Sequence, residues 1–347
     1  MRKILRKTNS SIGKELGALT ALVLLCVIMS ISSPHFLSLT NLMNILRQST
    51  LIGIVAAGMT FVIITGGIDL SVGSVLSLAS CITAGMIVNH EMNVWVSVFA
   101  GIILGAFLGF LNGLMITCIP LPPFIATLGI MGVARGLAFV YTGGAPIYTF
   151  PESFKFLGQG MIGPIPFPVI LMVVVYIIFY ILLKRTKLGR YTYAIGGNEE
   201  AAILSGIPTG RYKAIVYSLT GALAALAGMV LAARLDAATS VAGDGFELDV
   251  IAAVVIGGTS LSGGQGGVIG SLIGALIMGV VRNGLNLLLV SSHWQRVILG
   301  IIILAAVTVD VLRKKGVFLK ATKYKGVIKG DPDQVQESSL NNNKGGL

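Results

Sequence analysis

Residues 252–288 read AAVVIGGTSLSGGQGGVIGSLIGALIMGVVRNGLNLL, two apolar runs separated by a polar stretch rich in glycine. The apolar runs suit helices in lipid, whereas the glycines between them interrupt a helix. The whole chain follows the same pattern, since its 347 residues are 54% hydrophobic and only 11% charged, with a mean hydropathy of +0.89. Soluble domains are roughly 25% charged. The sequence therefore predicts a polytopic membrane protein with a single helical membrane domain.

About ten apolar runs follow one another, and a barrel is disfavoured because the runs are continuous and do not alternate. Two pairs of runs, 42–65 with 71–88 and 248–262 with 267–289, are separated by only a few residues. Both pairs are candidates for a broken or re-entrant helix. We predict an all-α polytopic membrane protein. The predicted spans are residues 16–33, 42–65, 71–88, 94–118, 123–141, 166–184, 213–233, 248–262, 267–289 and 294–312.

Nineteen of the 25 Lys and Arg residues precede the first span, follow the last span, or lie in the loop 184–213. With ten spans these three regions share one side of the membrane, which the positive-inside rule makes cytoplasmic. We therefore expect a cytoplasmic N-terminal tail (1–15), a transmembrane domain (16–312) and a basic, partly disordered cytoplasmic tail (313–347). The first apolar run is too long for a signal peptide and is expected to remain as a span. Attraction to anionic lipid explains the net charge of +11 without a nucleic-acid partner.

The pentapeptide Leu-Ser-Gly-Gly-Gln at 261–265 resembles the signature motif of ABC-transporter ATPases. Such an ATPase also needs a phosphate loop of the type G-x-x-x-x-G-K-[ST]. The one Gly-Lys pair of this chain, Gly13-Lys14, is followed by Glu15. The three cysteines fall within spans and the three histidines are scattered, so no metal-ligand spacing is present. We predict no catalytic residue, no metal and no cofactor.

Residues 66–73 (GGIDLSVG) match residues 257–264 (GGTSLSGG) at five of eight positions. Both stretches separate adjacent apolar runs, which indicates either a parallel internal repeat or a chance similarity of glycine-rich turns. We expect a glycine pair to end a helix at each break, since glycine adopts the left-handed cap conformation. The expected breaks are Gly66, Gly67, Gly257 and Gly258. Asp69 or Ser71, and Ser260 or Ser262, are expected to cap the helix that follows.

Asp69 is the only acidic residue between 41 and 90. An ionisable residue at membrane depth is a candidate for function, whereas at the membrane surface it would be a simple helix cap. Both interpretations stay open at this point.

Glycine occurs 45 times and forms two stripes with a spacing of four residues. Residues spaced by four lie on one face of a helix, where glycine lets two helices approach closely. The stripes favour a tight bundle and are compatible with a dimer. Their members are Gly101, Gly105, Gly109 and Gly113, and then Gly266, Gly270 and Gly274.

The loop 184–213 contains the signals of a short helix. Asn198 can cap it, Glu199 and Glu200 suit its positive end, and Gly206 with Pro208 ends it. The helix would begin with Glu199, Glu200, Ala201 and Ala202, and would offer Ile203 and Leu204 to a partner. The alternative is an ordinary solvated loop.

Four stretches together resemble the membrane permease subunit of ribose-type ABC sugar importers: TGGIDLSVGS (65–74), PPFIATLGIMGVARGLAF (122–139), AIGGNEEAAILSGI (194–207) and residues 252–288. The resemblance covers roughly residues 40–312. It implies a second permease, a cytoplasmic ATPase, an extracytoplasmic sugar-binding protein and a multi-pass location in a bacterial inner membrane. The segment Asn198–Gly206 resembles the coupling helix that docks on the ATPase. Gln265 departs from the pattern, since a basic residue is expected there in many relatives.

A sugar path needs polar groups that match hydroxyls, so Asn112, Asn283 and Asn286 are candidates beside Asp69 and Ser71. Hydrogen bonding between helices is the alternative role for the three asparagines. An ion-coupled secondary transporter of a small polar solute remains the alternative function, but few of the 14 acidic residues fall within the spans. A membrane-embedded enzyme would need a nucleophile paired with a base, or a metal cluster, and the sequence has neither.

Overall fold

The computed structural model describes the backbone of residues 2–314 and the side chains of residues 15–312, and most of the predicted basic tail (313–347) lies outside the described residues. The regular secondary structure of the described part is helical apart from four two-residue strands, which confirms the all-α prediction. The helices are α1 (Arg2–Ser32), α2 (Leu39–Ile64), α3 (Val72–Val88), α4 (Val94–Cys118), α5 (Pro123–Thr142), α6 (Glu152–Gln159), α7 (Phe167–Arg185), α8 (Lys187–Gly197), α9 (Glu199–Leu204), α10 (Thr209–Leu235), α11 (Phe246–Ile256), α12 (Val268–Leu287) and α13 (Ser292–Lys314). The strands β1 (Ile147–Tyr148) and β4 (Ala237–Ala238) pair antiparallel, as do β2 (Met161–Ile162) and β3 (Ile165–Pro166).

Each predicted span coincides with a helix, but the helices differ in length. Eight of the described helices are long and apolar enough to cross a membrane: α1, α2, α4, α5, α7, α10, α12 and α13. The helix α3 has 17 residues and α11 has 11. Eleven helical residues extend about 16 Å, roughly half of the hydrocarbon core. The predicted end of the span 248–262 is wrong, because α11 stops at Ile256 where the chain turns through Gly258 with a φ of +94°.

The two short helices start next to each other inside the bundle. α3 follows the non-helical residues 65–71, and α11 follows the turns of residues 239–245. A Cβ added to Gly73 would lie 2.2 Å from the carbonyl oxygen of Gly243, so only glycine permits this approach. The N–H of Gly243 also donates to the Ser77 hydroxyl at 2.9 Å. These two segments, each a non-helical stretch followed by a short helix, therefore meet in the protein interior.

The glycine stripes pack as the sequence predicts. On α4, a Cβ at Gly105 would lie 2.4 Å from the carbonyl oxygen of Gly221 on α10. A Cβ at Gly109 would lie 2.2 Å from the carbonyl oxygen of Tyr217 on the same helix. On α12, a Cβ at Gly274 would lie 1.8 Å from the Ala253 carbonyl oxygen of α11. These helix pairs are thus held by backbone contact, which gives close van der Waals packing in lipid.

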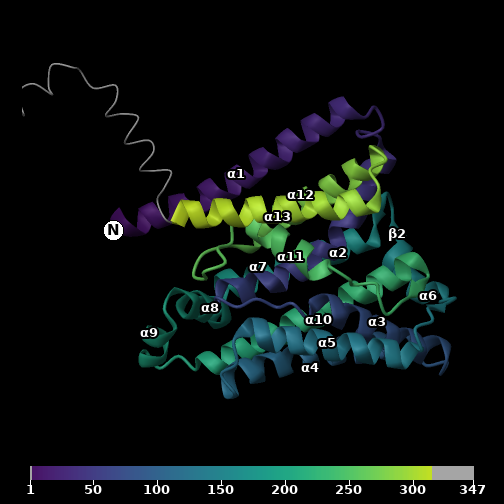
Figure 1. The fold of residues 1–347 in the computed structure, drawn as a ribbon, viewed down its shortest axis with the longest axis horizontal. Helices are drawn as coiled ribbons and strands as arrows, with labels where there is room; N and C mark the ends of the chain where they lie inside the picture. Colours follow the sequence, from purple (N-terminus) through teal and green to yellow (C-terminus); the bar gives the residue numbers. More distant parts are fainter. Residues whose placement is uncertain (1, 315–347) are drawn as a thin grey trace, which may run out of the picture.

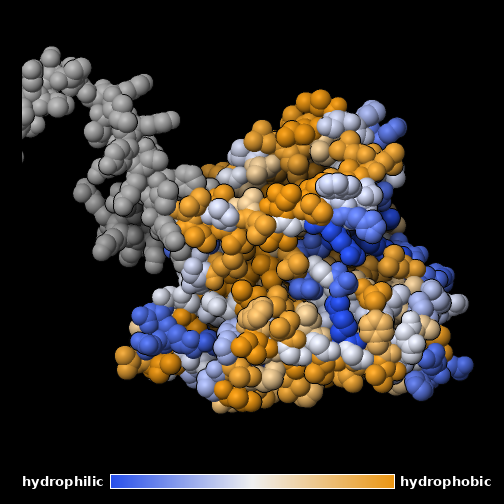
Figure 2. Space-filling model, viewed as in Figure 1, coloured by the Kyte–Doolittle hydropathy of each residue, from blue (hydrophilic) through white to orange (hydrophobic). Residues whose placement is uncertain are grey.

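The helices α2 and α10 form the centre of the bundle, whereas α1 and α13 lie along one side of it (Figure 1). Space-filling Figure 2 shows a mostly apolar surface over α1 and α13, as expected for lipid contact. Figure 1 also places α6 and β2 at one end of the bundle and α8 and α9 at the other. We refer to these as the α6 end and the α8–α9 end.

Candidate functional site

The helix breaks have the glycine conformation that the sequence predicts, but neither has the predicted side-chain cap. Gly66 has a φ of +82° and Gly258 one of +94°, which confirms that each glycine pair ends a helix. After the first break, Asp69 accepts hydrogen bonds from Ser71, the residue before α3, and neither side chain caps the helix itself. After the second, neither Ser260 nor Ser262 caps the next helix, so that expectation is wrong. The reason is that three further glycines with positive φ (Gly263, Gly264 and Gly266) prolong the loop, so α12 begins only at Val268.

Asp69, Ser71 and Asn112 come together as one buried cluster. Asp69 Oδ1 accepts from the Ser71 N–H at 2.8 Å and from its hydroxyl at 2.6 Å, and Asn112 Nδ2 donates to the same hydroxyl at 2.8 Å. Asp69 Oδ2 and Asn112 Oδ1 have no hydrogen-bond partner in the described part of the chain. The cluster joins α4 to the break before α3.

The other two candidate asparagines lie apart from this cluster and from each other. Asn283 on α12 and Asn41 on α2 exchange two amide hydrogen bonds, at 2.8 and 3.0 Å, and both are buried. Asn286 is one turn further along α12, and its Oδ1 accepts from Gln295 Nε2 of α13 at 2.9 Å. The contacts of Asn283 are those of a link between helices, whereas Asn286 lines a polar cavity.

This cavity has a volume of about 630 Å³ and lies at the α6 end, where α2, α6, α10, α11, α12 and α13 meet. Nine of its fifteen lining residues carry polar side chains: Asn44, Arg47, Gln48, Gln159, Arg234, Asp249, Arg282, Asn286 and Gln295. Leu51, Ile52 and Phe246 are among its apolar residues. A cavity with several amide and charged groups and one aromatic ring can bind a small polyhydroxyl molecule.

The charges of the cavity were not identified as site residues from the sequence. Arg282 donates to Asp249 Oδ2 in a short ion pair between α12 and α11. Arg47 on α2 and Arg234 on α10 line the same space. A signal was present, because six basic residues fall outside the three basic clusters at the predicted cytoplasmic side, and these three arginines are among them. Intramembrane charges of this kind mark solute pathways.

The face beside the cavity carries further polar groups at membrane depth. Figure 2 shows hydrophilic residues gathered on an otherwise apolar surface, between α13 and α5. Arg135, in the middle of α5, donates to Asp244 of the loop before α11 at 2.5 Å and to the Ser74 hydroxyl at 3.3 Å. The Asp244 side chain is 56% exposed. Exposed charges are unfavourable against lipid tails, so this face suits protein or water.

The second candidate surface is formed by α8 and α9. Asn198 Oδ1 accepts from the Ala201 N–H at 2.9 Å, and Gly206 has a φ of +79°, so the predicted helix cap and helix end are confirmed. Ala202 packs inward, whereas Ile203 and Leu204 are 55% and 88% exposed. Glu199 forms an ion pair with Lys213 of α10 at 2.6 Å, which leaves Glu200 as the exposed acid.

The helix α8 touches both helix breaks directly. A Cβ added to Gly196 would lie 1.7 Å from the Ile64 carbonyl oxygen and 2.6 Å from the Gly264 nitrogen. The Gly264 N–H itself donates to the Ile64 carbonyl at 2.9 Å, and Tyr193 donates to the Gly266 carbonyl at 2.7 Å. The two similar breaks therefore meet each other and α8 at a single junction.

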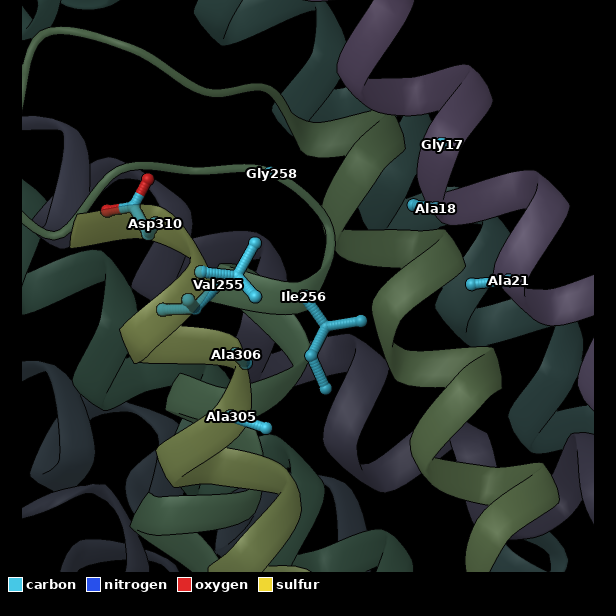
Figure 3. A pocket seen from close by; sticks show the side chains of 10 residues that line it. Gly17, Ala18, Ala21, Val255, Ile256, Gly258, Ala305, Ala306 and Asp310 are labelled. Atoms are coloured by element: carbon cyan, nitrogen blue, oxygen red, sulfur yellow. The ribbon is translucent and has the colours of Figure 1, made fainter. Parts of the chain in front are cut away.

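A smaller cavity of about 290 Å³ lies between α1, α13 and the end of α11 (Figure 3). Small residues dominate it, with Gly17, Ala18 and Ala21 on one side and Ala305 and Ala306 on the other. Its one carboxylate, Asp310, accepts from the Ser260 hydroxyl at 3.2 Å. This cavity has too few polar groups to bind a polyol.

A membrane-spanning helical bundle with a polar cavity at one end and a protruding helix pair at the other is an arrangement that suits a membrane transport protein. Residues 41–307 match the family described as branched-chain amino acid transport system / permease component. The chain belongs to this family of transport-system permease components.

Individual relatives are similar over most of their length. The ribose import permease protein RbsC of Bacillus subtilis (strain 168) is 52% identical over 87% of this chain and 94% of its own. RbsC of Escherichia coli (strain K12) is 49% identical over 85% of this chain and 93% of its own. The L-arabinose transport system permease protein AraH of the same strain is 38% identical over 89% of this chain and 95% of its own. No solved structure matches this chain significantly.

Proposed function

We propose that this chain is the membrane permease subunit of an ABC importer and forms the translocation path for ribose or a related monosaccharide. The names of the relatives support the sugar, since the two that are about half identical to this chain are ribose import permeases. The observation in the structure that supports a path is the polar cavity of about 630 Å³ at the α6 end. Its volume suits a small ligand.

Three partners complete this proposal. A cytoplasmic ATPase binds α8 and α9 through Ile203, Leu204 and Glu200, a sugar-binding protein delivers cargo at the α6 end, and a second copy of this chain completes the path. The polar face around Arg135 and Asp244 supports the second copy. An arginine or aspartate facing the bilayer centre costs about 2.5–3.5 kcal/mol, and a second permease covering this face would remove that cost.

The transport cycle in this proposal is alternating access. ATP binding by the partner moves α8 and α9, and the backbone junction at Gly196 passes the movement to both helix breaks. The first break leads into α3 and α11 ends at the second break, so a shift of these two helices opens or closes the path to the cavity. Asp69, Ser71 and Asn112 hold the first break during this movement.

ATP-driven uptake by reconstituted complexes tests the proposal. Vesicles that contain this permease, its ATPase and its binding protein should accumulate labelled ribose only when ATP and the binding protein are both supplied. Uptake that needs neither and follows a proton or sodium gradient would support the secondary-transporter alternative and contradict the proposal. Membership in the permease-component family already disfavours that alternative.

A further inference from the structure

The polar cavity carries more positive than negative charge. Three arginines line it, Arg47, Arg234 and Arg282, but only one acid, Asp249. Asp249 is paired with Arg282. Among the described residues, neither Arg47 nor Arg234 has a carboxylate within ion-pair distance. The cavity therefore contains two guanidinium groups in excess.

Folding does not explain this excess. Arg135, Lys155, Lys213 and Arg282 each have a carboxylate partner, as expected where a basic group stabilises the fold. Arg47 instead donates to the Met161 sulfur at 3.0 Å, and its Nε is buried without a partner in the described part. Like charges that share one cavity repel each other and oppose compact folding. A role in transport accounts better for their presence in the cavity.

We propose that Arg47 and Arg234, with Arg282 beside them, form an electrostatic barrier that excludes protons and metal cations from the sugar path. This inference rests on the proposed function, since it assumes that the cavity belongs to the path. Positive groups that line a confined cavity repel cations more strongly than in bulk water, because less water screens them. A neutral sugar is not repelled, and its hydroxyl oxygens accept hydrogen bonds from the guanidinium groups. The path can thus open without leaking cations across an energised membrane.

Sodium leak through the complete complex tests the barrier. Proteoliposomes with permease, ATPase and binding protein are loaded with a sodium-sensitive dye, and sodium influx and ribose uptake are measured during ATP-driven cycling. Arg47→Gln and Arg234→Gln should each raise the leak by about tenfold, which corresponds to about 1.4 kcal/mol of barrier. Ribose uptake is measured in parallel, and a fall in uptake reports the lost hydrogen bonds from the guanidinium groups to the sugar, separately from the leak.

Matched variants separate charge from structure. Arg47→Lys and Arg234→Lys keep the charge and should keep the leak at the wild-type level. Arg296→Gln removes an exposed arginine of α13 that does not line the cavity, and it should leave both measurements unchanged. If the glutamine variants fail to assemble, Arg47→His provides a switch within one folded protein, because its ring is charged below a pKa of about 6.5. Its sodium leak should be low at acidic pH and high at alkaline pH.

Two outcomes would overturn the inference. The first is a wild-type leak in both glutamine variants together with a large loss of ribose uptake, which would make the arginines cargo contacts. The second is an equal leak in the lysine and glutamine variants, which would make their shape the relevant property and not their charge. If the wild-type complex itself shows no ATP-driven ribose uptake, the proposed function fails, and this result is distinct from either outcome.

Discussion

Asp69 is a fully buried carboxylate, and one of its oxygens closes the turn that precedes α3. That role requires an acceptor at this oxygen and does not require a charge, because both donors belong to Ser71. A role on the translocation path would require the charge itself or the second oxygen. Two substitutions at this residue distinguish the alternatives.

We predict that Asp69→Asn preserves the turn, because its carbonyl oxygen can still accept both bonds. Its melting temperature in detergent and its ribose uptake should match the wild type. Asp69→Leu removes the acceptor, leaves buried donors unpaired at a cost of about 1–3 kcal/mol, and should lower the melting temperature. An asparagine variant that is stable but does not transport would instead assign the Asp69 charge to the path.

At the scale of elements, the junction of α8 with the two breaks offers a matched pair of adjacent glycines. A Cβ at Gly196 would collide with the Ile64 carbonyl oxygen at 1.7 Å, whereas one at Gly197 would meet nothing within 4 Å. Gly196→Ala should therefore separate α8 from the breaks and reduce uptake at least about tenfold, because misplaced elements are costly for function. Gly197→Ala should be neutral in uptake and in melting temperature. Equal ribose uptake by the Gly196→Ala and Gly197→Ala variants would show that this junction does not transmit the movement.

The helix α9 allows a second test at this scale. Glu199→Lys with Glu200→Lys reverses a helix-dipole contribution of roughly 0.3–1 kcal/mol per residue and breaks the ion pair with Lys213. We predict normal expression and membrane insertion, a sharp fall in uptake and reduced co-purification of the ATPase. Gly206→Val should act in the same direction, since Gly206 has a positive φ. Wild-type uptake with the ATPase bound normally would exclude α9 as the coupling element.

A charge swap separates the two roles of these acids. Glu199→Lys with Lys213→Glu restores the ion pair to α10 and should recover transport if Glu199 only positions α9. Glu200→Lys alone leaves that pair intact and should still weaken binding of the ATPase. Binding to the isolated ATPase, measured for both variants, provides the comparison.

At the scale of the whole molecule, the α6 end and the α8–α9 end lie on opposite sides of the bundle (Figure 1). The basic clusters predict that the α8–α9 end is cytoplasmic. In a chain without its three native cysteines, an impermeant maleimide should label Ser153→Cys and His90→Cys from outside intact cells. Lys187→Cys and Lys323→Cys should react only after permeabilisation, although position 323 lies outside the described residues. Labelling of position 187 from outside would contradict the proposed orientation.

Local features were predictable from the sequence because their causes are local. Asn198 and Gly206 delimit α9 through their own backbone and side-chain preferences, and the stripe from Gly101 to Gly113 predicted close packing through its spacing alone. The end of α11 was placed six residues too late, since the predicted span included the Gly257-Gly258 pair and the polar residues after it, where the helix has already ended. Ser260 and Ser262 were wrongly assigned as caps, since the sequence does not show how long the loop before α12 is. That length depends on the residues against which the loop packs.

The sequence alone determined that this chain is a helical membrane bundle, because hydropathy acts over single spans, and its basic clusters predict which end is cytoplasmic. Only the tertiary structure decided which polar residues form a site. Arg47, Arg234, Asp249 and Arg282 come from four different helices, and their spacing in the sequence does not show that they share a site. Their common cavity exists because α2, α10, α11 and α12 converge at the α6 end, and this convergence depends on packing between residues far apart in the chain.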